Sequence, residues 1–253
     1  MNNLYVISCQ RNANIFSKNC LESVALQTKK VKEHIFIDDV SSDETVDHVK
    51  DYIKNSDQDN IRLIANTERK YRLKNIRDAI YSINDPEGII LLLDGDDWFS
   101  TVEATNIVYS VYQKNKDLEY VYTNWMFSHD GQLGISRPIP SNEWCAYRDP
   151  WITSAMATFK VKTFMGIPES NFLDENNDYF KMGTDHAYVL PITHILKKKY
   201  GDYRAVGFIN RPLYVYQFVE NAKRRRVDEE GKWETNEAHR AATLIRERGF
   251  LND

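Results

Sequence analysis

Short apolar runs alternate along the first hundred residues with stretches in which apolar side chains recur every three or four positions. Such runs are typical of strands buried on both faces, and the periodic stretches are typical of amphipathic helices. We expect strands at 4–8, 34–37, 61–65 and 89–93, with helices at 15–27, about 46–53 and about 73–80. This β-α-β-α-β-α-β order predicts a doubly wound, mostly parallel sheet with right-handed crossovers.

Local signals sharpen some boundaries, and the pattern weakens in the second half. Residues 41–44, reading SSDE, form a capping-box signature for the second helix. Residues 119–123 and 213–216 read as strands, the latter preceded by Arg211-Pro212 as an edge marker. An apolar helix is expected at 187–196 and a surface helix at 238–245. The aromatic side chains of Trp144, Tyr147 and Trp151 either stack on the ring of a bound ligand or cover the sheet.

The composition is that of an ordinary soluble globular protein. The 253 residues are 42% hydrophobic and 28% charged, and the net charge of −4 carries no overall nucleic-acid signature. Three isolated cysteines lack metal-ligand spacing and read as reduced thiols. The start of the chain does not resemble a signal peptide, and no stretch approaches the ~20 apolar residues of a membrane span. We therefore expect a soluble, cytoplasmic protein.

The fourth predicted strand ends in three carboxylates, Asp94, Asp96 and Asp97, around Gly95. Carboxylates at the edge of a core repel one another and lose solvation, so a divalent cation would resolve the conflict. Mg²⁺ or Mn²⁺ would bridge them to a phosphate-bearing substrate. The alternative is structural: Asp-Gly makes a turn, and Asp97 caps a helix that begins near residue 102.

Polar clusters end three of the predicted strands, at residues 8–11, 38–39 and 94–97. Ligands of open α/β sheets bind beyond the carboxyl ends of the strands, so these clusters predict a site along one rim. The chain has no G-x-G-x-x-G after the first strand and no Walker-type G-K-[ST]. Phosphate would then have to be held through the metal.

Three segments together resemble the family-2 nucleotide-sugar glycosyltransferases of the GT-A fold. Residues 38–45 read DDVSSDET and resemble DDGSSDxT, with Val40 in place of glycine; residues 93–98 read LDGDDW and resemble LDxDDW. Residues 23–28, SVALQT, resemble the end of the family's first helix. The resemblance implies an α/β, Rossmann-like mixed and mostly parallel sheet flanked by helices. Residues 1–124 would bind the nucleotide sugar, and 125–253 would form a smaller acceptor-side part carrying the catalytic base.

The resemblance also implies roles for individual residues. Asp39 would accept hydrogen bonds from the base of the nucleotide, and Asp94 and Asp96 would match the DxD metal pair, with Asp94 nearer the ribose. Asp97 is a third carboxylate whose role stays open. The remaining residues implied in donor binding are Ser8, Gln10 and Arg11 beside the base, Gly95 in the DxD turn, and Lys74, Asn75 and Arg77 near the diphosphate.

Thr184-Asp185 lies where the family carries its ED motif, so the resemblance makes Asp185 the catalytic base, with Thr184 replacing glutamate. The residues alone also allow a structural alternative, in which Asp185 is only the cap of a helix and His186 is an exposed residue of that helix. Residues 153–160 resemble an SHLxTF stretch of a branch that includes viral and phage members, with Ala155 at the histidine. A histidine that many relatives place near the metal would fall about Val219.

The activity implied is a metal-dependent inverting transfer of a sugar, from a UDP-sugar, to the hydroxyl of a glycan acceptor. A hydroxymethylated base of phage-type DNA is an alternative acceptor, because the basic run 223–226 could contact a polyanion. Two alternatives belong to other classes: a metal-dependent phosphotransferase with a nucleophilic aspartate, and a nucleotide-sugar-binding module without turnover.

Overall fold

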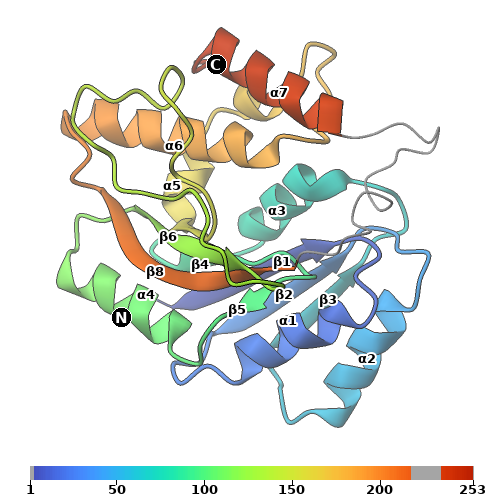
Figure 1. The fold of residues 1–253 in the computed structure, drawn as a ribbon. Coiled ribbons are helices and arrows are strands. Elements are labelled where there is room, and N and C mark those ends of the chain that lie inside the picture. Colours follow the sequence, from blue (N-terminus) through green and yellow to red (C-terminus); the bar gives the residue numbers. More distant parts are fainter. Residues whose placement is uncertain (1–2, 218–234, 253) are drawn as a thin grey trace.

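The computed structural model describes residues 3–217 and 235–252. Within them one eight-stranded sheet has the order β3-β2-β1-β4-β7-β6-β8-β5 (Figure 1). The strands are β1 (Leu4–Gln10), β2 (Glu33–Asp38), β3 (Ile61–Ala65), β4 (Ile89–Leu92), β5 (Trp98–Phe99), β6 (Tyr120–Phe127), β7 (Ala157–Lys160) and β8 (Val206–Tyr216). The helices are α1 (Phe16–Ala25), α2 (Thr45–Asn55), α3 (Tyr71–Tyr81), α4 (Ala104–Lys114), α5 (Val161–Met165), η1 (Glu169–Phe172, a 3-10 turn), α6 (Thr184–Tyr200) and α7 (Thr235–Arg248).

Strand directions bring most carboxyl ends to one rim. Strands β3, β2, β1 and β4 are parallel. Strand β7 is antiparallel to both β4 and β6, so β6 and its parallel neighbour β8 run in the direction of β4. The carboxyl ends of β1, β2, β4, β6 and β8 therefore share one edge. The predicted α/β class with a mixed, mostly parallel sheet is confirmed.

Two hydrophobic cores follow from the alternation of side chains along the strands. Tyr5 and Ile7 of β1 face the core shared with α3, α5, α6 and α7. Leu4 and Val6 face the core shared with α1, α2 and α4. Figure 1 shows these two groups of helices on opposite faces of the sheet. The burial of β1, β2 and β4 on both faces explains why they read as continuous apolar runs, whereas the edge strand β3 is only partly buried.

The structure corrects the prediction for the last strand. Strand β8 begins at Val206, so Arg211-Pro212 lies inside it and does not precede it. The register between β6 and β8 shifts at Asn124, which is paired with Pro212. Proline lacks the N–H that a ladder needs, and a bulge is where an interior strand tolerates it.

Two predicted helix caps are also corrected. Helix α2 begins at Thr45, and the capping box does not form: the Thr45 N–H donates to Asp43 Oδ1 at 3.0 Å. Helix α4 begins at Ala104, and Asp97 does not cap it. Helix α7 is longer than predicted and buries Ile245 against the core.

The sheet runs through both predicted parts of the chain, and residue 124 lies within β6. Of the helices in the described residues, none combines the length and the apolar character needed to cross a membrane.

Candidate active site

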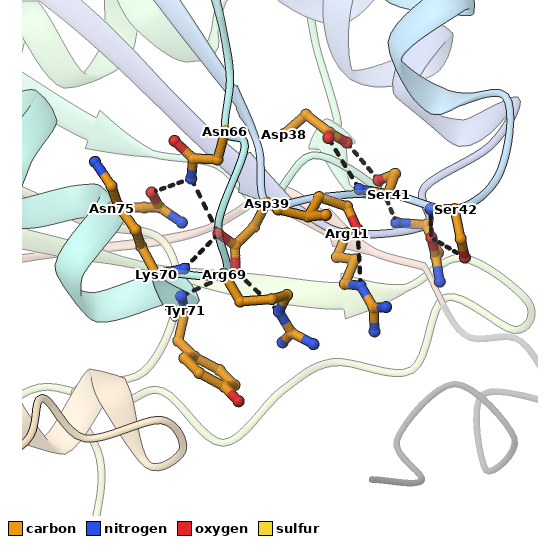
Figure 2. A network of polar contacts seen from close by, with 12 residues as sticks. Arg11, Asp38, Asp39, Ser41, Ser42, Asn66, Arg69, Lys70, Tyr71 and Asn75 are labelled. Carbon is orange, nitrogen blue, oxygen red and sulfur yellow. Dashed lines mark hydrogen bonds and ion pairs between the residues drawn. The ribbon is translucent and has the colours of Figure 1, made fainter. Parts of the chain in front are cut away.

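The Asp39 carboxylate, just beyond β2, is enclosed by donors of the segment between β3 and α3 (Figure 2). Its Oδ1 accepts hydrogen bonds from the Lys70 N–H at 2.8 Å and from Asn66 Nδ2 at 3.0 Å. Its Oδ2 accepts from the Tyr71 N–H at 2.9 Å and from Arg69 Nε at 3.3 Å. The residue is only 3% exposed. Four protein donors therefore hold this carboxylate in one orientation at the rim.

The backbone of the segment is shaped for this purpose. Tyr71 has a φ of 60°, in the left-handed region, which a bulky residue rarely adopts without compensation. Asn66 also donates to Asn75 Oδ1 at 2.7 Å, tying the loop to α3. Burial pushes the pKa of Asp39 upward, but the bonds from Lys70 and the neighbouring amides outweigh it and hold the pKa below its ordinary value.

The DDVSSDET segment forms a second ordered loop beside the first. Asp38 accepts hydrogen bonds from the N–H and hydroxyl of Ser41. Val40 has a φ of 62°, so this β-branched side chain occupies the left-handed conformation that glycine adopts without strain. The Val40 carbonyl accepts a bond from Arg11 Nε at 3.1 Å, which places Arg11 at the same loop (Figure 2).

The three carboxylates after β4 occupy different environments. Asp94 and Asp96 are partly exposed, whereas Asp97 is 1% exposed and accepts bonds from the Tyr214 hydroxyl and the Gln217 N–H. Burial, with the nearby charges of Asp96 and Asp94, raises the pKa of Asp97 well above its usual range. Asp97 is therefore a buried anchor between the DxD turn and the end of β8.

Gly95 is required by packing within this turn. A Cβ at this position would lie 2.8 Å from Gln10 Cβ and 3.0 Å from the Phe36 ring. Such distances are closer than real Cβ contacts, so a side chain would push the turn away from β1 and β2. Gly95 thus places the DxD turn directly against Gln10.

Arg72, in the first turn of α3, joins the two halves of the candidate site. Its Nε donates to Asp94 Oδ1 at 2.8 Å. Its Nη1 donates to Asp185 Oδ1 at 2.8 Å and to Thr184 Oγ1 at 2.7 Å. The Arg72 side chain is 24% exposed. Arg72 is not among the residues predicted from the sequence, where the one available signal is an arginine directly before the buried Leu73 at a helix start near the rim.

Asp185 lies in the first turn of α6, behind Gly183 with a φ of 65°. Its Oδ1 also accepts a bond from the Tyr188 hydroxyl, and its side chain is 55% exposed. Partial desolvation pushes the pKa of Asp185 up, but the charge of Arg72 outweighs it and holds the pKa below the ordinary value. A group ionised at neutral pH and open to solvent can accept a proton from a bound hydroxyl.

Aromatic side chains border Asp185 on α6. The His186 ring stacks on Trp151 with centroids 4.3 Å apart, and burial lowers the pKa of His186 to about 4. His186 is thus neutral and half-buried, so the prediction of an exposed helix residue is wrong. Trp144 is buried and packs edge-on against Tyr203, and Tyr147 packs edge-on against His194.

Several predicted donor residues lie apart from this cluster. Ser8 is fully buried and bonds His34 Nε2 at 2.9 Å. Lys74 pairs with Asp78 at 3.1 Å, and Arg77 pairs with Glu169 at 3.1 Å. Val219 and the run 223–226 fall outside the described residues.

Asp94 and Asp96 could bind a hard divalent cation only if a substrate supplied the remaining oxygen ligands. Among residues 3–217 and 235–252, no group of three or more His, Cys, Asp or Glu side chains could hold a metal ion. Asp94 and Asp96 offer carboxylate oxygens at one turn, which fits Mg²⁺ or Mn²⁺ bound through one or two carboxylates together with substrate phosphates. The residues therefore fit a metal that arrives with a phosphorylated ligand.

Residues 6–155 match the model of the glycosyl transferase family 2, and because this is more than half of the chain, the chain belongs to that family. The predicted family and enzyme class are thereby confirmed. No protein of curated function matches the chain by sequence.

Solved structures of glycosyltransferases share the fold at low sequence identity. TarS of S. aureus aligns with a TM-score of 0.62 and 14% identity over 85% of this chain and 37% of TarS, so the chain spans well under half of that protein. Mannosyltransferase PcManGT from Pyrobaculum calidifontis, in complex with GDP-Man and Mn²⁺, gives 0.54 and 14% over 96% and 69% of the two chains. Glucosyl-3-phosphoglycerate synthase from Mycobacterium tuberculosis gives 0.59 and 11% over 100% and 81%. These neighbours confirm the GT-A type of fold, while the viral and phage branch stays a prediction.

Proposed function

We propose that the protein is a metal-dependent inverting glycosyltransferase that moves a sugar from a UDP-sugar to the hydroxyl of a glycan. The observation that carries the proposal is the Arg72 bridge, which brings Asp94 of the DxD turn and Asp185 of α6 to the same guanidinium at 2.8 Å each. The donor-side and acceptor-side groups thus face one site. The Asp39 loop lies along the same rim, at the carboxyl end of the neighbouring strands.

The donor would be held by its two ends. Arg11 and the loops around Asp39 would take the nucleotide, and Asp94, Asp96 and Gly95 would lie beside the ribose and the diphosphate. Solved neighbours support a nucleotide-sugar donor, because TarS is known in complex with UDP-GlcNAc and PcManGT in complex with GDP-Man. A divalent cation held by Asp94 and Asp96 would supply charge neutralisation for the leaving diphosphate.

Asp185 would act as the general base. Its carboxylate takes the proton from the acceptor hydroxyl while that oxygen forms a bond to the anomeric carbon. The bond from the anomeric carbon to the phosphate oxygen breaks, and its electron pair leaves with the nucleoside diphosphate. Attack from the face opposite the leaving group inverts the anomeric configuration. The Trp151–His186 stack beside Asp185 offers an apolar surface on which an acceptor ring can rest.

A transfer assay tests this proposal. The protein is incubated with Mn²⁺, UDP-sugars and oligosaccharide acceptors, and the product is analysed by NMR for its anomeric configuration. We expect a new glycosidic bond of configuration opposite to the donor, dependent on the metal. Retention of configuration would contradict the role of Asp185. Release of phosphate from simple phosphoesters, without sugar transfer, would favour a phosphotransferase.

A further inference from the structure

We propose that Arg72 is a positioning residue that fixes the base Asp185 relative to the donor carboxylate Asp94, an inference that rests on the proposed function. Arg72 belongs to the donor half by sequence, 113 residues before Asp185. It touches both halves through two nitrogens of a single planar group.

The geometry assigns different tasks to the two oxygens of Asp185. Oδ1 accepts from Arg72 Nη1 at 2.8 Å and from the Tyr188 hydroxyl. Oδ2 has no hydrogen bond to a protein group in the described part of the chain. Oδ1 is thus held by two hydrogen-bond donors, and Oδ2 is left to take the proton from the hydroxyl of the acceptor substrate.

A guanidinium suits this task better than an ammonium group. Its donors lie in a rigid plane, so the bond to Asp94 through Nε fixes where Nη1 points. Thr184 Oγ1 accepts a further bond from Nη1 at 2.7 Å, which anchors the guanidinium at the start of α6. The Arg72 side chain is largely shielded from solvent, whereas that of Asp185 is 55% exposed. The orientation of the base therefore depends on Arg72 and Tyr188.

The same contact sets the charge at the base. Among the described residues, the groups that face Asp185 are Arg72 from α3, Tyr188 and His186 from α6, and Tyr120 from β6. Arg72 is the permanent cation of this set, because burial lowers the pKa of His186 to about 4. Removing the Arg72 charge makes the Asp185 carboxylate easier to protonate, and a purely structural role would not produce that effect.

The test compares the Arg72→Gln and Arg72→Lys variants with Arg62→Gln. Arg62 is a matched control, because it pairs with Glu33 at 2.7 Å on β3 and β2, away from the rim. Misplacing a reacting group costs about 10²-fold in rate, so we expect kcat of Arg72→Gln to fall by about that factor. An adjacent cation typically lowers a carboxyl pKa by about 1 to 3 units, so the acid limb of kcat should move upward by about one pH unit or more. Arg72→Lys should keep the acid limb near that of the wild type and still lose rate.

A second readout does not depend on turnover. The pKa of Asp185 is followed by carbon NMR of its carboxyl group in the wild type and in both variants, after thermal melting confirms that each variant folds. We expect a higher pKa in Arg72→Gln than in the wild type and little change in Arg72→Lys.

The outcomes separate the two proposals. An unchanged Asp185 pKa in folded Arg72→Gln, or an acid limb and kcat equal to those of Arg62→Gln, would overturn the role of Arg72. A wild-type protein that transfers no sugar, yet shows the expected NMR shift, would instead overturn the proposed function and keep the Arg72–Asp185 coupling.

Discussion

Asp39 and Asp185 are both aspartates with a lowered pKa at the same rim, but the chain achieves this in two different ways. Asp39 is buried, and its donors come from the short segment 66–71. Asp185 is half exposed and depends on one cation from a distant helix. A locally built site keeps its shape without ligands, whereas a site built through one long-range contact is sensitive to a single residue.

This difference also explains how much of the site could be predicted from the sequence. The strands and their terminal carboxylates follow from short-range patterns, so the position of Asp39, Asp94 and Asp96 beyond the ends of β2 and β4 could be predicted, whereas their roles stay predictions. Arg72 could not be predicted, because its importance depends on where α6 starts in space. Lys74 and Arg77 have the same charge and lie on the same helix, and only the position of Arg72 directly before Leu73, at the start of that helix, separates it from them.

The first half of the fold was predicted better than the second for a related reason. Parallel strands joined by helices follow the order of the chain, whereas β7 inserts between β4 and β6. The bulge at Pro212 likewise depends on pairing with Asn124. Such non-local pairings leave no periodic signal in a single sequence.

The strongest loss of activity is expected from a substitution of the proposed base, Asp185. Asp185→Asn removes the proton acceptor, so we expect kcat to fall by about 10³-fold, within the range of general-base contributions. Because the side chain is 55% exposed, the melting temperature should change little. Steady-state transfer kinetics measure the first effect and thermal melting the second. The exposed Asp178→Asn serves as the control, and transfer at the wild-type rate by Asp185→Asn would remove the base from the account.

A substitution of Asp39, in the proposed donor site, is expected to lower both stability and nucleotide-sugar binding. Asp39→Asn replaces one oxygen of this buried carboxylate with an NH2 group, so the N–H of either Lys70 or Tyr71 loses its acceptor, which costs about 3 kcal/mol of stability. Urea denaturation measures this loss, and nucleotide-sugar binding should disappear with it. Asp43→Asn, which affects the part-buried bond from the Thr45 N–H at the start of α2, should cost about 1 kcal/mol. Equal losses in the two variants would contradict the special role of the Asp39 loop.

The lowered pKa of Asp39 also predicts how the stability of the protein depends on pH. The pKa of Asp39 is lower in the folded protein than in the unfolded chain, where it is about 3.9. Its contribution to stability is therefore complete above the unfolded pKa and is lost as pH falls through the folded pKa. Urea midpoints measured from about pH 5 downward should fall more steeply for the wild type than for Asp39→Asn. Parallel curves would show that another group dominates this range.

The smallest expected effect concerns Val40. A non-glycine residue in the left-handed region costs about 1 to 2 kcal/mol, and the added freedom of glycine in the unfolded chain returns part of that. Val40→Gly should therefore stabilise the protein by about 1 kcal/mol, because the bond from Arg11 goes to the backbone carbonyl and is kept. Val46→Gly within α2 should destabilise instead. A loss of stability in both variants would show that the Val40 side chain contributes more by packing than its conformation costs.

If the carboxyl-end rim of the sheet is a metal-dependent nucleotide-sugar site, its ligands should stabilise the protein against thermal unfolding. UDP, GDP and CDP and their sugar conjugates are added to the wild type and to Asp96→Asn, each with and without Mn²⁺. Ligand binding raises apparent stability, so we expect a manganese-dependent rise in melting temperature with UDP-sugars that Asp96→Asn abolishes. The absence of any shift in the wild type with every nucleotide, with or without metal, would contradict the account.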